Sequence, residues 1–164
     1  MVKSGVGKGD KMIRKLLIAN RGEIAVRIAK TAAEMDIATV AIHPADDLAS
    51  LHVREADEAV ALVGSGTAAY LAGEAIVAAA LERGCDAIHP GYGFLAENAG
   101  FAQACADAGV VFVGPTAQTL ALFGDKCAAR GHAEACGVAI LPGTLGATSF
   151  DEARANPSFS ARKP

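Results

Sequence analysis

Short, wholly apolar runs alternate with longer segments of helical character along most of the chain. Runs of this length without polar alternation are typical of strands that are buried on both faces of a parallel sheet. Their alternation with helices predicts an α/β fold with a three-layer, Rossmann-like open sheet that is mainly parallel. The predicted strands are residues 16–19, 38–42, 59–63, 87–89 and 110–113.

The segments between these runs carry helix signals. In the first helix, Ile24, Ile28 and Met35 share one face, while charged residues lie on another side. Polar residues suited to capping helix starts, and glycines suited to ending helices, set the predicted boundaries. The predicted helices are residues 22–35, 51–55, 73–83, 98–108, 116–123 and 125–136, with caps at Asn20, Asp46, Asp47, Asn98, Thr116 and Asp125.

Composition narrows the classes of function. The chain is 52% hydrophobic but only 5% aromatic, so we expect a thin core with helices close to the strands. A net charge of −3 argues against a nucleic-acid partner. No apolar run approaches the roughly 20 residues that span a membrane. The four cysteines lack Cys-x-x-Cys spacing, so we expect free, buried thiols, no metal site and a cytoplasmic location.

Both ends of the chain depart from the alternation. Residues 1–14 are rich in glycine and lysine and are predicted to be a disordered extension, with Met12 as the natural start. Residues 148–153 resemble a capped helix start, but no periodicity continues after them. We therefore interpret residues 143–164 as a truncated, non-native tail and assign one folded domain to residues 15–123.

The most specific stretch is a loop after the fourth strand, residues 89–98, which we call the signature loop. Loops at the carboxyl ends of parallel strands hold ligands in open α/β sheets. Glycines on both sides of Tyr92 permit close approach of a ligand. In the alternative interpretation, His89 is a core residue, Tyr92 packs and Asn98 only caps a helix. The candidate residues are His89, Pro90, Gly91, Tyr92, Gly93, Phe94, Glu97 and Asn98.

A second candidate is the turn between the first strand and the first helix, formed by Asn20, Arg21, Gly22 and Glu23. A dinucleotide site would place Gly-x-Gly-x-x-Gly here, and this turn has one glycine. The alternative is a capped helix with a surface ion pair. Residues 64–69 match Gly-x-Gly-x-x-Ala, but their helix is expected to begin too late, so we predict a flexible surface loop.

Lys126 is the third candidate. It follows Gly124 and Asp125 and lies in the first turn of a predicted helix. A cation there opposes the helix dipole, and an anionic partner such as a nucleotide phosphate would offset this. The alternative is a solvated lysine.

In this order, these segments resemble the N-terminal, pre-ATP-grasp domain of biotin carboxylases. The resemblance runs from about residue 15 to residue 142, and residues 124–142 would begin the connection to the ATP-grasp domain. Ala96 departs from it, since the family usually has serine there. Further matching segments are Ala56-Asp57-Glu58, Tyr70-Leu71 and Phe112-Val113-Gly114-Pro115.

The resemblance implies an ATP-dependent ligase that, with Mg²⁺, activates bicarbonate as carboxyphosphate and carboxylates biotin. It implies that Lys126 contacts ATP and that Tyr92 and Gly93 line the biotin side of the cleft. It also implies a homodimer to which Lys30 and Glu34 contribute. The implied partners are the ATP-grasp domain, a biotin carrier and a carboxyltransferase, and a separate transferase would choose the acyl acceptor.

The family's metal-binding glutamates and catalytic base lie beyond the matching region. We therefore expect no catalytic residue in this chain, no tight binding of ATP, biotin or Mg²⁺, and no activity of the chain alone. Two other functions stay open at this point. One is a non-catalytic assembly or dimerisation module, and the other is the nucleotide-binding domain of a dehydrogenase or of another ATP-grasp enzyme.

Overall fold

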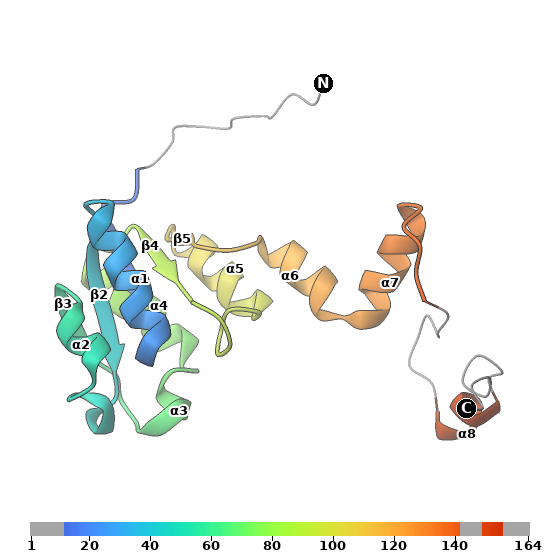
Figure 1. The fold of residues 1–164 in the computed structure, drawn as a ribbon, viewed down its shortest axis with the longest axis horizontal. Coiled ribbons are helices and arrows are strands. Elements are labelled where there is room, and N and C mark those ends of the chain that lie inside the picture. Colours follow the sequence, from blue (N-terminus) through green and yellow to red (C-terminus); the bar gives the residue numbers. More distant parts are fainter. Residues whose placement is uncertain (1–11, 142–148, 156–164) are drawn as a thin grey trace. The chain divides into compact units, whose positions relative to one another are not determined.

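The computed structural model describes residues 12–141 and 149–155. The chain divides into two compact units, Met1–Ala117 and Gln118–Pro164. The first unit contains a parallel five-stranded sheet in the order β3-β2-β1-β4-β5 (Figure 1). The predicted fold class is confirmed, with small shifts at the strand ends. The strands are β1 (Lys15–Ile18), β2 (Ala38–His43), β3 (Glu58–Ala61), β4 (Ala87–His89) and β5 (Val111–Phe112).

Helices cover both faces of this sheet, which gives the three layers (Figure 1). On one face α1 (Gly22–Glu34) packs beside α2 (Leu51–Glu55), and on the other α4 (Gly73–Glu82) packs beside α5 (Ala99–Asp107). The 3₁₀ helix η1 (Ala45–Asp47) follows β2, and α3 (Gly66–Ala69) precedes α4. The prediction of a loop over residues 64–69 is therefore wrong for its last four residues, which form α3.

Alanines form the buried face of α1. Ala25, Ala29 and Ala32 pack against the side chains of β1, whereas Ile24 and Ile28 are only partly buried and Met35 is 63% exposed. Small side chains let the helix lie close to the sheet, as the composition predicted. The larger residues instead line an open groove of about 520 Å³.

The core on the opposite face is larger. Tyr70, Ile76 and Ile88 are completely buried there, and the rings of Phe101 and Phe112 meet edge to face with centroids 6.0 Å apart. This core fixes α4 and α5 against the sheet, so the loops at the carboxyl ends of the strands have a rigid base.

The four cysteines are free, as predicted, but they are not all buried. Burial raises the pKa of the Cys85 and Cys105 thiols to about 11. Cys127 is half-buried and Cys136 is exposed, because the helix that bears them buries none of its residues. The prediction of four buried thiols is wrong at these two positions.

Several helix caps are as predicted. The Asn98 side chain accepts a hydrogen bond from the Phe101 amide, and Asp125 accepts from the amides of Cys127 and Ala128. Asn98 thus begins α5 and Asp125 begins α7 (Lys126–Ala135), which lies between α6 (Ala117–Gly124) and α8 (Phe150–Ala155) in the sequence. Ser149 and Glu152 form a reciprocal capping box before α8, as residues 148–153 predicted.

Other caps are not formed. Asn20 does not cap α1, because Arg21 takes the cap position and its side chain makes no capping bond. The side chains of Asp46 and Asp47 likewise do not cap α2, and both bind elsewhere. The predictions for residues 1–11, and for most of residues 143–164, concern positions outside the described residues. No helix in the described part of the chain is long and apolar enough to cross a bilayer.

Gly91 makes the tightest packing at the junction of β1 and β4. Its φ is +66°, and a Cβ built on it would lie 2.7 Å from Nδ2 of Asn20 and 2.7 Å from Cγ2 of Ile24. Gly93 has a similar φ of +68°, but a Cβ there would meet nothing within 4 Å. Both glycines therefore adopt a left-handed backbone conformation, but only Gly91 has close neighbours where a side chain would begin.

We expect Gly91→Ala to lower the free energy of unfolding by about 2–4 kcal/mol, because it adds a steric clash to left-handed strain. Gly93→Ala, the matched control, is expected to cost only the strain, about 1–2 kcal/mol. Urea unfolding of the two variants compares them directly. An equal loss at both positions would contradict the close packing of Gly91.

Candidate functional site

The centre of the site is the edge of the sheet where β1 and β4 end side by side. The strand order changes direction between them, and such switch points are where open α/β sheets bind ligands. In this chain the Asn20 carboxamide, which is 0% exposed, lies in that position. Its Nδ2 donates to the carbonyl oxygens of Pro90, at 2.8 Å, and Tyr92, at 3.0 Å. The turn after β1 and the signature loop are thus joined directly.

Two further contacts shape the signature loop. The Gly91 amide donates to Nδ1 of His89 at 3.0 Å, which leaves the ring proton on Nε2. Burial lowers the pKa of His89, so the neutral ring required for this bond is favoured. Phe94 has a φ of +41°, and its ring stacks on that of Tyr70 at 5.5 Å between centroids. The loop is therefore anchored on both sides of Tyr92.

Tyr92 itself projects from the anchored loop. Its side chain is 60% exposed, and its hydroxyl reaches Glu23, in the first turn of α1, at 3.5 Å. Gly93 beside it is open to solvent on its Cβ side. These two residues present an accessible surface at the ligand edge, whereas His89 and Asn98 have structural partners.

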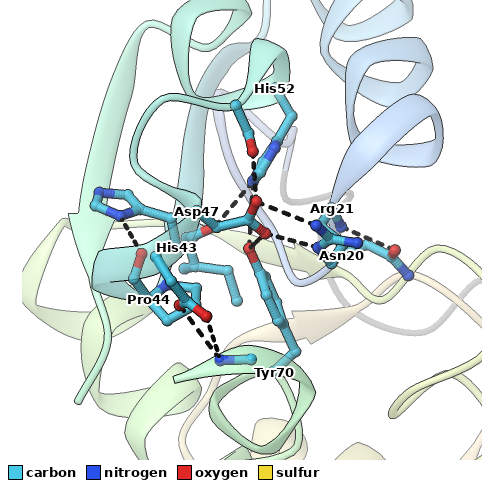
Figure 2. A network of polar contacts seen from close by, with 11 residues as sticks. Asn20, Arg21, His43, Pro44, Asp47, His52 and Tyr70 are labelled. Atoms are coloured by element: carbon cyan, nitrogen blue, oxygen red, sulfur yellow. Dashed lines mark hydrogen bonds and ion pairs between the residues drawn. The ribbon is translucent and has the colours of Figure 1, made fainter. Parts of the chain in front are cut away.

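Arg21 belongs to a second network at the same edge (Figure 2). Its guanidinium binds the Asp47 carboxylate in two places, at 2.6 and 3.1 Å, and the Tyr70 hydroxyl donates to the same carboxylate at 2.8 Å. Ser50 donates to Asp47 as well. Such paired contacts are stronger than single neutral hydrogen bonds. The network ties the start of α1 to η1 and to the buried Tyr70.

The electrostatics of this network follow from its contacts. The hydrogen bond from Arg21 holds the pKa of the Asp47 carboxyl well below its usual range, and the same bond raises the pKa of Arg21. Burial, together with the bond to Asp47, raises the pKa of Tyr70. His52 lies next to this network, with Nε2 3.2 Å from the Ile42 carbonyl oxygen, and burial lowers its pKa. Near neutral pH, Asp47 and Arg21 are therefore charged, and Tyr70 and His52 are neutral.

The glycine-rich stretch at residues 64–69 is closed to phosphate. The Gly66 amide, at the start of α3, donates to the Asp46 carboxylate at 3.0 Å. The Gly66 amide that could donate to a phosphate is thus already bonded to the Asp46 carboxylate. The negative charge of this carboxylate also repels an anion. The rejection of a dinucleotide site here is supported by this geometry.

Lys126 lies in the second unit, in the first turn of α7, and it is exposed. The side chain of Asp125 caps that helix start. The cation is therefore available to a partner that approaches this end of α7. Lys30 and Glu34 are exposed on α1, where a partner subunit could reach them.

Sequence reasoning missed the network around Asp47. The sequence pattern predicts a helix cap at Asp46 and Asp47, and it places Tyr70 only in a matching segment. Of the partners of Asp47, Arg21 and Tyr70 lie 26 and 23 residues away, and no local pattern links them to it. Within the described part of the chain, no group of three or more histidine, cysteine or acidic side chains could hold a metal ion.

The arrangement supplies rigid positioning and an accessible loop. At this edge Arg21 and Asp47 are paired with each other, and Asp46 binds a backbone amide, which suits a wall that shapes a cleft. The arrangement of side chains at this edge does not resemble a general acid, a general base and a nucleophile placed for proton transfer.

Comparison with known proteins agrees with this geometry. Residues 12–120 match the family described as the biotin carboxylase N-terminal domain. The chain is 51% identical over 142 residues to a putative urea carboxylase of Emericella nidulans, covering 86% of this chain and 11% of that protein. It is 49% identical over 139 residues to a biotin carboxylase of Nostoc, covering 84% of this chain and 31% of that protein.

Solved structures give the same result. The biotin carboxylase domain of a single-chain bacterial carboxylase superposes with a TM-score of 0.82 at 57% identity, covering 86% of this chain and 33% of that one. The biotin carboxylase domain dimer of Hydrogenobacter thermophilus 2-oxoglutarate carboxylase, solved with MgADP, ADP and bicarbonate, gives a TM-score of 0.84 at 43% identity. It covers 88% of this chain and 32% of that one.

This chain spans between about a tenth and a third of the length of these relatives. The match extends across the whole sheet and both loops of the ligand edge. A dehydrogenase is thereby excluded. The chain belongs to the biotin carboxylase N-terminal domain family, which is part of the biotin-dependent carboxylases.

Proposed function

We propose that this chain forms one wall of the cleft in which a biotin-dependent carboxylase binds ATP and biotin. The observation that carries the proposal is the exposed pair Tyr92 and Gly93, held at the ligand edge by the bonds from Asn20. The likeness to a domain solved with MgADP and bicarbonate supports it. In the complete enzyme, ATP would supply the phosphoryl group that activates bicarbonate for transfer to biotin.

Within this proposal each candidate residue has a distinct role. Tyr92 and Gly93 face biotin, because they are exposed next to the backbone that Asn20 holds at the ligand edge. Lys126 binds the nucleotide phosphates through its exposed cation, as the resemblance to biotin carboxylases implies. Asn20, Arg21, Gly22 and Glu23 form the turn that supports the loop, and none of them is a catalytic residue.

The domain boundaries and partners follow from the same proposal. Residues 15–123 would be the N-terminal domain, and residues 124–142 would lead into an ATP-grasp domain. The remaining partners would be a biotin carrier and a carboxyltransferase. The free cysteines fit a cytoplasmic location.

A second candidate function is assembly. Lys30 and Glu34 are exposed on α1, beside the groove that Ile24 and Ile28 help to line. An exposed helix face of this kind suits a homodimer contact, and the dimeric domain of the 2-oxoglutarate carboxylase supports that interpretation. The same groove also reaches Gly91 and Tyr92, so the proposed dimer contact and the proposed cleft wall are neighbouring surfaces of one chain.

A polypeptide of these 164 residues is expected to show no bicarbonate-dependent ATP hydrolysis stimulated by free biotin, because one wall cannot enclose the reactants. A complete carboxylase that carries this domain is the positive control in the same assay. Turnover by the 164-residue chain alone would contradict the proposal.

Lys126→Ala in that complete carboxylase is expected to raise KM for ATP about tenfold to a hundredfold, since a charged hydrogen bond contributes about 1.5–3 kcal/mol. The fold is expected to stay intact, because Asp125 still caps α7. Arg83→Ala, which removes a cation that is paired with Glu58, is the control. Steady-state kinetics check both variants, and an unchanged KM for ATP in Lys126→Ala would refute the role.

Gly93→Val is expected to lower kcat/KM for free biotin about tenfold or more, because a bulky side chain would fill the space through which biotin approaches. Gly84→Val is a matched control: Gly84 has a φ of +65°, and a Cβ there would also meet nothing within 4 Å. Gly84 ends α4, away from the signature loop. Equal losses in the two variants would show that strain, and not blockage, causes the effect.

A further inference from the structure

The Asn20 carboxamide uses all its principal hydrogen-bonding groups in one arrangement. Nδ2 donates to Pro90 and Tyr92, and Oδ1 accepts from the Arg21 amide at 2.9 Å. The two loop carbonyls lie on either side of Gly91 along the chain, 70 and 72 residues from Asn20. A single buried side chain therefore binds the loop backbone at two points, one before Gly91 and one at Tyr92 itself.

Few other side chains could make this contact. Aspartate has the same shape but would direct an oxygen at two carbonyl oxygens. Alanine would leave both carbonyls without their donor. Gly91 completes the fit, because any larger residue would place its Cβ 2.7 Å from Nδ2 of Asn20. The side chain and the loop are complementary at the level of single atoms.

Among the described residues, the loop has few other contacts close to Tyr92: the Ala96 amide donates to the Gly93 carbonyl oxygen at 2.8 Å, and the Tyr92 hydroxyl reaches Glu23 at 3.5 Å. The Phe94 ring stacks on Tyr70 after the bend, and the Gly91 amide binds His89 before it. Between these anchors, the Tyr92 side chain is mostly exposed and Gly93 has open space on its Cβ side. Asn20 is the contact that reaches the carbonyl of Tyr92 itself.

We infer that Asn20 is a positioning residue, which sets where Tyr92 and Gly93 stand in the cleft without touching a substrate. The inference rests on the proposed function, in which these two residues face biotin. The inference goes further than the proposed function. It states that the biotin-facing loop is held in place by a side chain outside the loop, in the turn that follows β1.

The first test uses the 164-residue chain. Asn20→Asp and Asn20→Ala are expected to speed amide hydrogen exchange at Gly91 about tenfold or more relative to core amides of α4, because the loop opens locally. Asp57→Ala is the control. Asp57 holds Thr39 at the opposite edge of the sheet, through bonds of 2.7 and 2.8 Å. If the aspartate variant does not fold, the alanine variant, which buries no charge, decides the result.

An unchanged ratio of loop to core exchange in the Asn20 variants would overturn the inference. An equal rise of the Gly91 exchange rate in Asp57→Ala would also overturn it. Such a rise would show that the whole domain had lost stability, and not that the loop had been released.

The second test uses a complete carboxylase that carries this domain, with free biotin as the probe. Asn20→Ala is expected to raise KM for biotin about tenfold to a hundredfold, as a misplacement of about 1 Å can do, and to change KM for ATP less than about twofold. A merely structural defect would lower the amount of active enzyme and leave both KM values unchanged.

Gly93→Val separates this inference from the proposed function. A loss of biotin affinity in Gly93→Val but not in Asn20→Ala overturns the positioning role and leaves the proposed function standing. If neither variant affects biotin, the loop is not the biotin wall, and both the assignment of Tyr92 and Gly93 and the inference fail. A loss in both variants supports both.

Discussion

The ligand edge of this domain depends on one buried amide. Asn20 joins the end of β1 to the loop after β4, at the position where a Rossmann-like sheet would otherwise open to a ligand. Because this amide binds two carbonyl oxygens of the loop, the turn after β1 and the signature loop are held together at that position. The glycine at residue 91 is part of the same contact, since its missing side chain is the space that the amide occupies.

Fixed charges complete that wall. The Arg21 guanidinium and the Asp47 carboxylate satisfy each other, and the Tyr70 hydroxyl adds a third contact (Figure 2). Tyr70 also supports Phe94 through ring stacking, so the charged network and the signature loop share one buried aromatic residue. Preorganised surroundings of this kind orient reactants without rearranging when they bind.

The sequence predicted the sheet well, because buried strands and helix-ending glycines leave local signals. It predicted the face of α1 less well: Ile24, Ile28 and Met35 were the conspicuous apolar residues, yet the buried residues are alanines. The candidate turn and loop were recognised by their residues, and the contact between them was not. A hydrogen bond from Asn20 to backbone carbonyls some 70 residues away depends on the order of the strands, which no local pattern contains.

The order of the strands also has a consequence for synthesis of the protein. β1 is central, but its second neighbour, β4, comes more than 60 residues later and follows four α-helices, one 3₁₀ helix and two strands. While the chain leaves the ribosome, β1 and β2 can pair early, and β1 keeps one unpaired edge that is open to wrong partners. The Asn20 amide reaches its acceptors only when Pro90 and Tyr92 have emerged. The bonds that shape the ligand edge are thus among the last that this sheet can form during translation.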